Sequence, residues 1–226
     1  VPELPNNPSL YTLTLAAAGY FESIRFLEQD RVRNSQYKDN AKRAKLLSNS
    51  KNLKSYLVSL KMESKISSFD NMGLPRVTQL VNKSNQFNLT TKRYTQSQLE
   101  EISNDNKYFT RQISLIDVFG DNGMISVIIC ESKDDIWEID TWLMSCRVLG
   151  RDLEYALLND LVINARNFNI NTLRGIYIET PKNSLVKEHY KKLGFLKTKN
   201  LKGTIYWELK IDKYRKLEVP IKVCSF

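Results

Sequence analysis

The 226-residue sequence is poor in the residues that disulfide and metal proteins use. It has three cysteines, at positions 130, 146 and 224, and a single histidine. The cysteines form no C-x-x-C pair and their number is odd, which predicts a reducing compartment without structural disulfides. We therefore expect a cytoplasmic protein, and no metal site, because so few Cys and His side chains are at hand.

Long apolar runs, glycine and proline are also scarce. The longest nearly unbroken apolar run covers residues 124–130, far short of the ~20 residues of a spanning helix, so no membrane segment is expected. Only eight glycines and six prolines occur, which excludes collagen-like and low-complexity chains. The hydrophobic content of 42% is enough for a core, and the length predicts one domain with an appendage or two small domains.

The formal net charge of +9 is spread unevenly. Basic residues are in excess at both ends of the chain, and the middle is slightly acidic. The C-terminal lysines are scattered through strand-like sequence and are not interleaved with aromatics, so we expect no nucleic-acid binding. Two interpretations stay open: a solvated lysine-rich face, or a basic rim that attracts an anionic substrate or an acidic carrier protein.

Hydrophobic periodicity predicts alternating strands and helices after a helical N-terminal segment. Residues 1–60 are expected to form a linker, a short helix near 13–18 and helices within 28–60. Asn122-Gly123 predicts the turn of a β-hairpin, because both residues accept positive φ. Further strands are expected at 62–69, 108–118, 124–131, 136–144, 172–178 and 205–211, and helices at 74–81, from the capping box at Thr95, at 152–168 and at 184–193.

Residues 142–154 run from the end of a strand into the start of a helix, where backbone N–H groups and the helix dipole favour a phosphate. Arg147 and Arg151 add charge there, and Gly150 lets a ligand approach the backbone closely. The alternative is a plain tight turn in which Asp152 caps the helix.

Two motifs of the chain resemble the GNAT acyltransferases. These motifs are Arg147-x-x-Gly150, and Asn183 followed by Val186, Tyr190 and Gly194-Phe195. The resemblance implies an α/β fold with a GNAT-like mixed sheet flanked by helices, and a loop that binds the pyrophosphate of coenzyme A. It makes Tyr190 a candidate catalytic acid for a leaving thiolate. The implied cofactor-binding residues are Arg147, Val148, Leu149, Gly150, Arg151 and Asn183.

One position of the loop departs from the GNAT pattern. Asp152 stands where that family has Gly or Ala. A carboxylate beside a pyrophosphate counts against ordinary binding of acetyl-coenzyme A.

Longer strings, at residues 1–5, 79–94, 117–123 and 145–151, resemble the C-terminal half of the FkbH-like proteins. Members of that family carry an N-terminal haloacid-dehalogenase (HAD)-type phosphatase domain. They load a glyceryl group derived from bisphosphoglycerate onto an acyl carrier protein. The phosphatase motif D-x-D-x-T/V does not occur here. The resemblance implies a detached acyltransferase half, with residues 1–60 as linker and helical segment and 61–226 as the acyltransferase domain, and a HAD-type phosphatase domain in the full-length chain.

Cys146 is the candidate nucleophile. A thiol beside Arg147 and Arg151 is expected to ionise easily and to hold an acyl group as a thioester. The alternative is a small buried hydrophobe, which is the interpretation that we give to Cys130. Asp140, on the strand that leads to Cys146, either orients or deprotonates an incoming group or pairs with Arg147.

The string before Thr95 supplies the candidate substrate-binding residues. Its amides, hydroxyls and one guanidinium either bind a carboxylate or phosphate, or form a structural loop tied by Asx turns. His189 is expected on the surface of the last helix. The candidate substrate-binding residues are Asn85, Gln86, Asn88, Thr90 and Arg93.

Three functions follow. The first is an acyltransferase that moves a glyceryl-type acyl group, through a thioester on Cys146, to the phosphopantetheine thiol of an acyl carrier protein. The second is a GNAT N- or O-acetyltransferase that uses acetyl-coenzyme A. The third is a non-catalytic module that docks a carrier protein to a separate phosphatase. In the first two, phosphopantetheine is the cofactor, as a carrier arm or as coenzyme A.

Overall fold

The computed structural model describes residues 5, 7–17 and 33–225. The chain divides into two compact units, Val1–Ala41 and Lys42–Phe226. The first contains η1 (Pro8–Leu10), α1 (Tyr11–Ala17) and the start of α3 (Arg33–Ser48). Residue 18 and the part of the predicted helical stretch 28–60 that precedes residue 33 lie outside the described residues.

The second unit already begins within the predicted 1–60 segment. Its first complete helix, α4 (Leu53–Ser59), buries Tyr56 and Leu57 in the main core, together with the following Leu60. Asn52 caps this helix through a capping box with Ser55. The structure thus places the end of this segment inside the core of the second unit.

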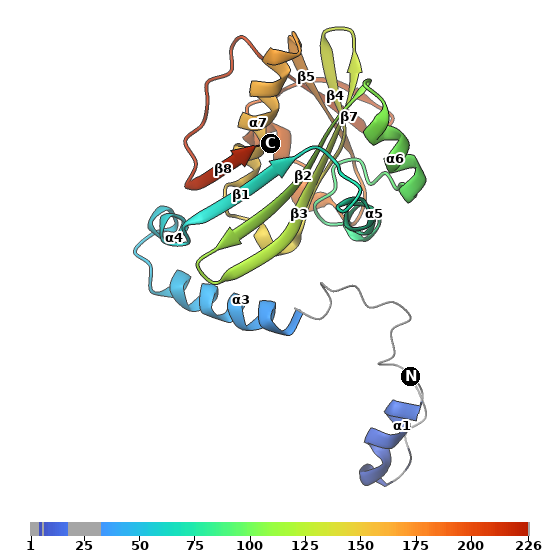
Figure 1. The fold of residues 1–226 in the computed structure, drawn as a ribbon, viewed down its shortest axis with the longest axis vertical. Helices are drawn as coiled ribbons and strands as arrows, with labels where there is room; N and C mark the ends of the chain where they lie inside the picture. The colour runs from blue at the N-terminus through green and yellow to red at the C-terminus, as the bar shows by residue number, and fades with distance from the viewer. Residues whose placement is uncertain (1–4, 6, 18–32, 226) are drawn as a thin grey trace. The chain divides into compact units, whose positions relative to one another are not determined.

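One eight-stranded mixed sheet forms the centre of the second unit (Figure 1). The strand order is β6-β7-β5-β4-β3-β2-β1-β8. Neighbouring strands are antiparallel except in the pairs β4/β5 and β1/β8, which are parallel. The strands are β1 (Met62–Ser67), β2 (Tyr108–Asp117), β3 (Gly120–Lys133), β4 (Ile136–Met144), β5 (Thr172–Ile178), β6 (Leu196–Leu201), β7 (Thr204–Lys210) and β8 (Ile221–Ser225).

Helices cover both faces of the sheet (Figure 1). On one face α5 (Leu74–Lys83) and α6 (Gln96–Asn104) pack on apolar residues of β3 and β4. On the other face α7 (Leu153–Asn167) and α8 (His189–Lys192) pack into the larger core cluster. α6 begins at the predicted capping box, in which Thr95 and Gln98 exchange hydrogen bonds.

The predicted hairpin turn at Asn122-Gly123 is wrong. The turn between β2 and β3 lies at residues 118–119, and Asp117 faces Gly120. Asn122 and Gly123 lie inside β3, where the register shifts and Gly123 takes a φ of 65°. The Asn-Gly pair therefore serves a β-bulge, which needs positive φ as much as a hairpin turn does.

The predicted helix at 184–193 is interrupted, and the predicted surface position of His189 is wrong. The segment forms η3 (Ser184–Val186) and then the short α8. His189 is buried, with its ring packed edge-on against Phe87 and Trp142. Burial lowers the pKa of His189 to about 3, so its imidazole is neutral.

A β-bulge in β4 at Asp140 marks the point beyond which β4 and β5 no longer pair. Thr141 faces Ile129 of β3 and Ile139 faces Cys130, so Asp140 is the extra residue. The paired register of β4 and β5 ends at Ile139 and Gly175, although β4 continues to Met144 and β5 to Ile178. The bulge bends β4, and the two parallel strands diverge beyond it.

Candidate functional site

A short segment of the chain fills the opening between the diverging ends of β4 and β5. We call residues 87–90 the strap. On the β4 side, Leu89 N–H donates to Trp142 O (3.2 Å) and Met144 N–H donates to Phe87 O (3.1 Å). On the β5 side, Ile178 N–H donates to Leu89 O (2.9 Å). The strap therefore pairs with both strands as an additional short strand would.

Side chains fix the strap as well. The Asn183 amide donates to Asn88 O (3.0 Å) and to Ile178 O (2.9 Å), and its oxygen accepts from Thr180 N–H (2.9 Å). Thr90 Oγ1 donates to Asp140 O (2.8 Å). Asn183, predicted to bind a cofactor, thus lies fully buried with both ends of its amide bonded to protein atoms.

Most of the remaining polar residues before Thr95 also bond to nearby backbone or to one another. Arg93 donates to the carbonyls of Val81 and Ser84 at the C-terminal end of α5, and to the Asn85 side chain. Asn88 Oδ1 accepts from Thr91 N–H (2.8 Å) in an Asx-type turn. Gln86 is exposed. Of the candidate substrate-binding residues, the structure thus gives Asn85, Asn88, Thr90 and Arg93 bonds within the protein.

Asp140 lies at the bulge with two neighbours that the sequence did not point to. Its carboxylate forms an ion pair with Lys92, and accepts from Tyr94 Oη (2.5 Å) and Thr141 Oγ1 (3.0 Å). Burial, followed by the hydrogen bond to Asp140, raises the pKa of Tyr94 well above its usual value. Lys92 and Tyr94 lie two and four residues after the strap, so the same stretch of chain brings them to Asp140.

Tyr190 lies in the interior, in an aromatic cluster with Trp142, His189 and Phe195. Its ring packs on Gly175 of β5, where a Cβ atom would lie 2.4 Å from the ring, so only glycine fits there. Its hydroxyl lies beside the Ile176 backbone without the geometry of a hydrogen bond, and burial raises its pKa well above the usual value. The structure does not place this hydroxyl on the surface where Cys146 lies.

Cys146 is the exposed thiol of the chain, whereas Cys130 is buried and Cys224 is half-buried. It begins a single 3-10 turn, η2 (Cys146–Val148), directly after β4. Ser145 N–H donates to Ile125 O (2.7 Å), and Arg147 Nε donates to Ser145 Oγ (3.2 Å). The predicted core position of Cys130 is confirmed, and burial raises the pKa of its thiol.

Arg151 is turned away from solvent, toward a buried carboxylate. Its guanidinium donates to Asp117 Oδ2 (3.0 Å) and to Arg147 O (2.8 Å). Asp117 also accepts two hydrogen bonds from Arg43, both 2.8 Å, and one from Phe119 N–H (2.9 Å). Burial alone would raise the pKa of Asp117, but these bonds outweigh it and lower the pKa. Asp117 therefore anchors the loop that carries Cys146.

The N-terminal end of α7 carries two carboxylates. Asp152 occupies the N-cap position with a φ of 60° and makes no side-chain cap, so the predicted capping alternative is wrong. Glu154 is half-buried in the first turn, and one of its oxygens is buried without a partner. Burial raises the pKa of both groups. At Gly150 a side chain would meet no neighbouring atom, so it is the positive φ of 72° that favours glycine there.

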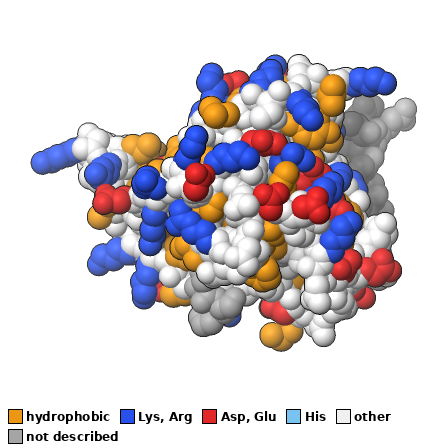
Figure 2. All heavy atoms as spheres, turned by 90° about the horizontal axis from the view of Figure 1, so that it is seen from above, with side chains coloured by type: hydrophobic (Ala, Val, Ile, Leu, Met, Phe, Trp, Pro, Cys, Tyr) orange, Lys and Arg blue, Asp and Glu red, His pale blue; other side chains and the backbone are white. Residues whose placement is uncertain are grey.

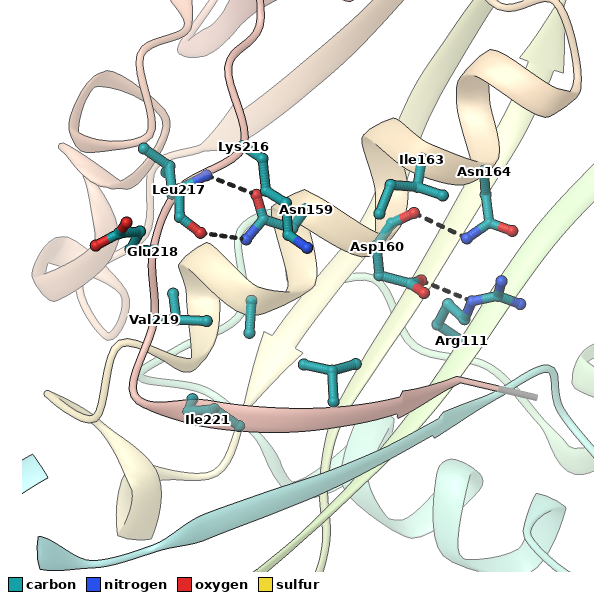
Figure 3. A pocket seen from close by; sticks show the side chains of 12 residues that line it. Arg111, Asn159, Asp160, Ile163, Asn164, Lys216, Leu217, Glu218, Val219 and Ile221 are labelled. Carbon is teal, nitrogen blue, oxygen red and sulfur yellow. Dashed lines mark hydrogen bonds and ion pairs between the residues drawn. The ribbon is translucent and has the colours of Figure 1, made fainter. Parts of the chain in front are cut away.

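A cleft of about 980 Å³ lies elsewhere, between α7 and the segment that leads into β8 (Figure 3). A buried ion pair between Arg111 and Asp160 (2.9 Å) borders it. Asn159 bonds both to the Leu217 carbonyl (2.8 Å) and to its N–H (2.9 Å). None of the predicted site residues is among those that line this cleft.

On the face in Figure 2, Lys and Arg side chains are spread over the surface with Asp and Glu side chains among them. Within the described ranges, no group of three or more His, Cys, Asp or Glu side chains is placed to hold a metal ion. None of the helices that the structure describes has the length and apolar character needed to cross a bilayer.

Solved structures share their fold with about two thirds of this chain. A spermidine N-acetyltransferase from Vibrio cholerae, solved with CoA and spermine, aligns with a TM-score of 0.51 and 14% identity over 67% of this chain and 97% of its own. A domain from Methanocaldococcus jannaschii aligns with a TM-score of 0.54 and 13% identity over 66% and 99%. The GNAT domain of S. lividans PAT gives 0.51 and 12% over 64% and 89%.

These similarities show a GNAT fold, and the predicted fold class is confirmed. No family model matches the sequence, and no curated protein matches it. The resemblance to the FkbH-like proteins therefore remains a prediction.

Coenzyme A does not fit the opening of this sheet in the conformation described. An arm with amide groups can bind between two strands only through their free N–H and C=O groups, and here the strap occupies those of Trp142, Met144 and Ile178. Asp152 and Glu154 at the start of α7 also repel a pyrophosphate. No step of a reaction can therefore be derived through coenzyme A held between β4 and β5.

Proposed function

We propose that this chain is an acyltransferase domain that holds a glyceryl-type acyl group as a thioester on Cys146 and passes it to a thiol of an acyl carrier protein. The observation that carries the proposal is the position of Cys146. Its thiol is exposed at the end of β4, while the opening of the sheet is filled by the strap. The fold and the FkbH-like strings support acyl transfer as the reaction type.

The reaction has two balanced steps. In the first, Cys146 Sγ attacks the carbonyl carbon of an activated acyl donor and loses its proton to solvent. The bond from the acyl carbon to the donor's leaving group breaks, and that group departs with the electron pair. In the second, the thiolate of the carrier's phosphopantetheine attacks the thioester, and the Cys146 thiolate leaves. One thioester replaces another, so the second step is nearly thermoneutral.

Residues around Cys146 have separate roles in this proposal. Arg147, next to the thiol, supplies positive charge for the thiolate and for the phosphate of the incoming arm. Arg151 acts as a positioning residue, because its guanidinium is bound to Asp117 and holds the loop. A HAD-type phosphatase domain, on the same chain or a separate one, is the expected companion of this domain.

Intact-protein mass spectrometry tests the proposal. The full chain is incubated with a glyceryl thioester of a small thiol and, in parallel, with acetyl-coenzyme A. We expect a glyceryl adduct that maps to Cys146, disappears when a holo carrier protein is added, and is absent in Cys146→Ala. Cys224→Ala is the matched control and is expected to form the adduct as the wild type does.

The same experiment separates the alternatives. Transfer from acetyl-coenzyme A with full activity in Cys146→Ala would favour a direct GNAT acetyltransferase. A chain that binds the carrier and forms no adduct with any donor would favour a docking module. Cys146→Ser is expected to form an oxygen ester slowly and then to stall before the carrier thiol, which identifies the attacking atom.

A further inference from the structure

We infer that the strap is a fixed part of the sheet which closes the opening between β4 and β5, so that the thiol that meets Cys146 comes from outside the sheet on a carrier protein. This inference rests on the proposed function for the identity of the thiol. The closure itself rests only on the contacts of residues 87–90.

The first argument is the hydrogen bonding on both sides of the strap. The backbone of Phe87 and Leu89 is bound to β4 and to β5, the Asn183 amide holds Asn88 O, and the Thr90 hydroxyl is bound to Asp140 O. A strap that left the sheet would leave these groups and their partners on both strands unpaired. Buried N–H and C=O groups are rarely left unpaired in native proteins.

The second argument is burial. Leu89, Asn88, Thr90 and Phe87 are all buried, and the Phe87 ring packs edge-on against His189 with 5.0 Å between ring centres. A movable lid is expected to have few buried contacts, because local opening is easy only where little is lost. The strap has the burial of a core strand.

The third argument concerns the partner. Free coenzyme A has to be held along its arm, and the strap occupies the edges that would hold it. A carrier protein binds through its own surface and needs only to present the end of its arm to the exposed Cys146. The net charge of +9 favours encounter with an acidic partner of this kind.

Amide hydrogen exchange of the wild-type full chain, followed by NMR, tests the closure directly. We expect the N–H groups of Leu89, Met144 and Ile178 to exchange within about tenfold of Ile128, which lies in the central β3, and to be unchanged by millimolar coenzyme A or free pantetheine. Exchange that is more than about a hundredfold faster than that of Ile128, or that shifts when coenzyme A is added, would show a strap that opens.

A matched pair of variants sharpens the test. Asn183→Ala removes the side chain that ties the strap to β5, and is expected to speed the exchange of Leu89 by about 10- to 100-fold relative to Ile128. Asn164→Ala, which removes a half-buried amide bound only to Asp160 O, is expected to leave Leu89 unchanged. Equal exchange of Leu89 in both variants would contradict the role of Asn183. If Asn183→Ala does not fold, the wild-type comparison alone decides the closure.

The outcomes for closure and for function are distinguishable. An adduct on Cys146 together with an opening strap would leave the proposed function standing and overturn the inference. Protected strap amides without any adduct would leave the closure standing and overturn the proposed function.

Discussion

The strap and the loop that carries Cys146 both lie beside the C-terminal half of β4, and both are rich in polar residues. In the strap the polar side chains are buried and bonded to backbone groups. In the loop Cys146 and Gly150 are exposed, while Val148 and Arg151 are buried. The difference teaches that polar residues beside the diverging strands are used to satisfy backbone hydrogen bonds. A side chain available for reaction is found instead in the neighbouring loop, where Cys146 is exposed.

Cys146→Ala gives the largest effect expected on the reactive side of this comparison. We expect acyl transfer to be lost completely, because the covalent route has no other exposed thiol among the described residues. The free energy of unfolding should change by less than about 0.5 kcal/mol, as is usual for exposed positions. Transfer assays and urea unfolding measure the two effects. Retained transfer would contradict the covalent route.

Leu89→Ala gives the largest effect expected on the structural side. Leu89 is completely buried in the strap, and truncation of a buried leucine lowers the free energy of unfolding by about 2–5 kcal/mol. Leu185→Ala, at an exposed position, is the matched control and should cost less than about 0.5 kcal/mol. Similar urea midpoints for the two variants would show that the strap contributes little to stability.

Arg151→Met tests the residue of the loop to which we assign a structural role. We expect a loss of roughly 1.5–3 kcal/mol in unfolding free energy, because a charged hydrogen bond to buried Asp117 disappears. Arg147→Met, at a half-buried position, is expected to lower stability less and to slow transfer more. The reverse ranking would move Arg151 to the reactive side of the comparison.

The buried His189, which packs against Phe87 of the strap, should make stability depend on pH. Its folded pKa of about 3 lies below the unfolded value of 6.5, so only the unfolded state binds the proton between these values. Stability is therefore lost as pH falls, by about 2 kcal/mol between pH 7 and pH 5. In His189→Phe that part of the loss should vanish, as measured by urea unfolding at both pH values. Equal losses in both proteins would show that His189 is protonated in the folded state.

Local signals in the sequence predicted most of the elements. The hydrophobic patterns that predicted β4 and β5, and the capping box at Thr95, depend on neighbours within a few residues. The structure shows both strands and the capping box where they were expected. The prediction of a turn at Asn122-Gly123 failed because hairpin turns and β-bulges both use positive φ, and an Asn-Gly pair does not distinguish them.

The site was less predictable, because its contacts join distant parts of the chain. Nothing local in residues 87–90 indicates that they bond to residues 142, 144, 178 and 183. The partners of Asp140 depend on a bulge that one strand alone does not reveal. Cys146 was chosen for its position between a strand and a helix beside two arginines and for the family resemblance, and its role stays a prediction. The burial of His189 depends on where Phe87 lies, which no local pattern reveals.

The strap also sets a limit on how this protein can be shortened. A fragment that begins after residue 90 would keep strands β2 to β8 but lose the strap. The edges of β4 and β5 beyond the bulge would then face each other without partners. Such unpaired edges recruit strands from other molecules. Minimal domains for expression or fusion should therefore start well before residue 87.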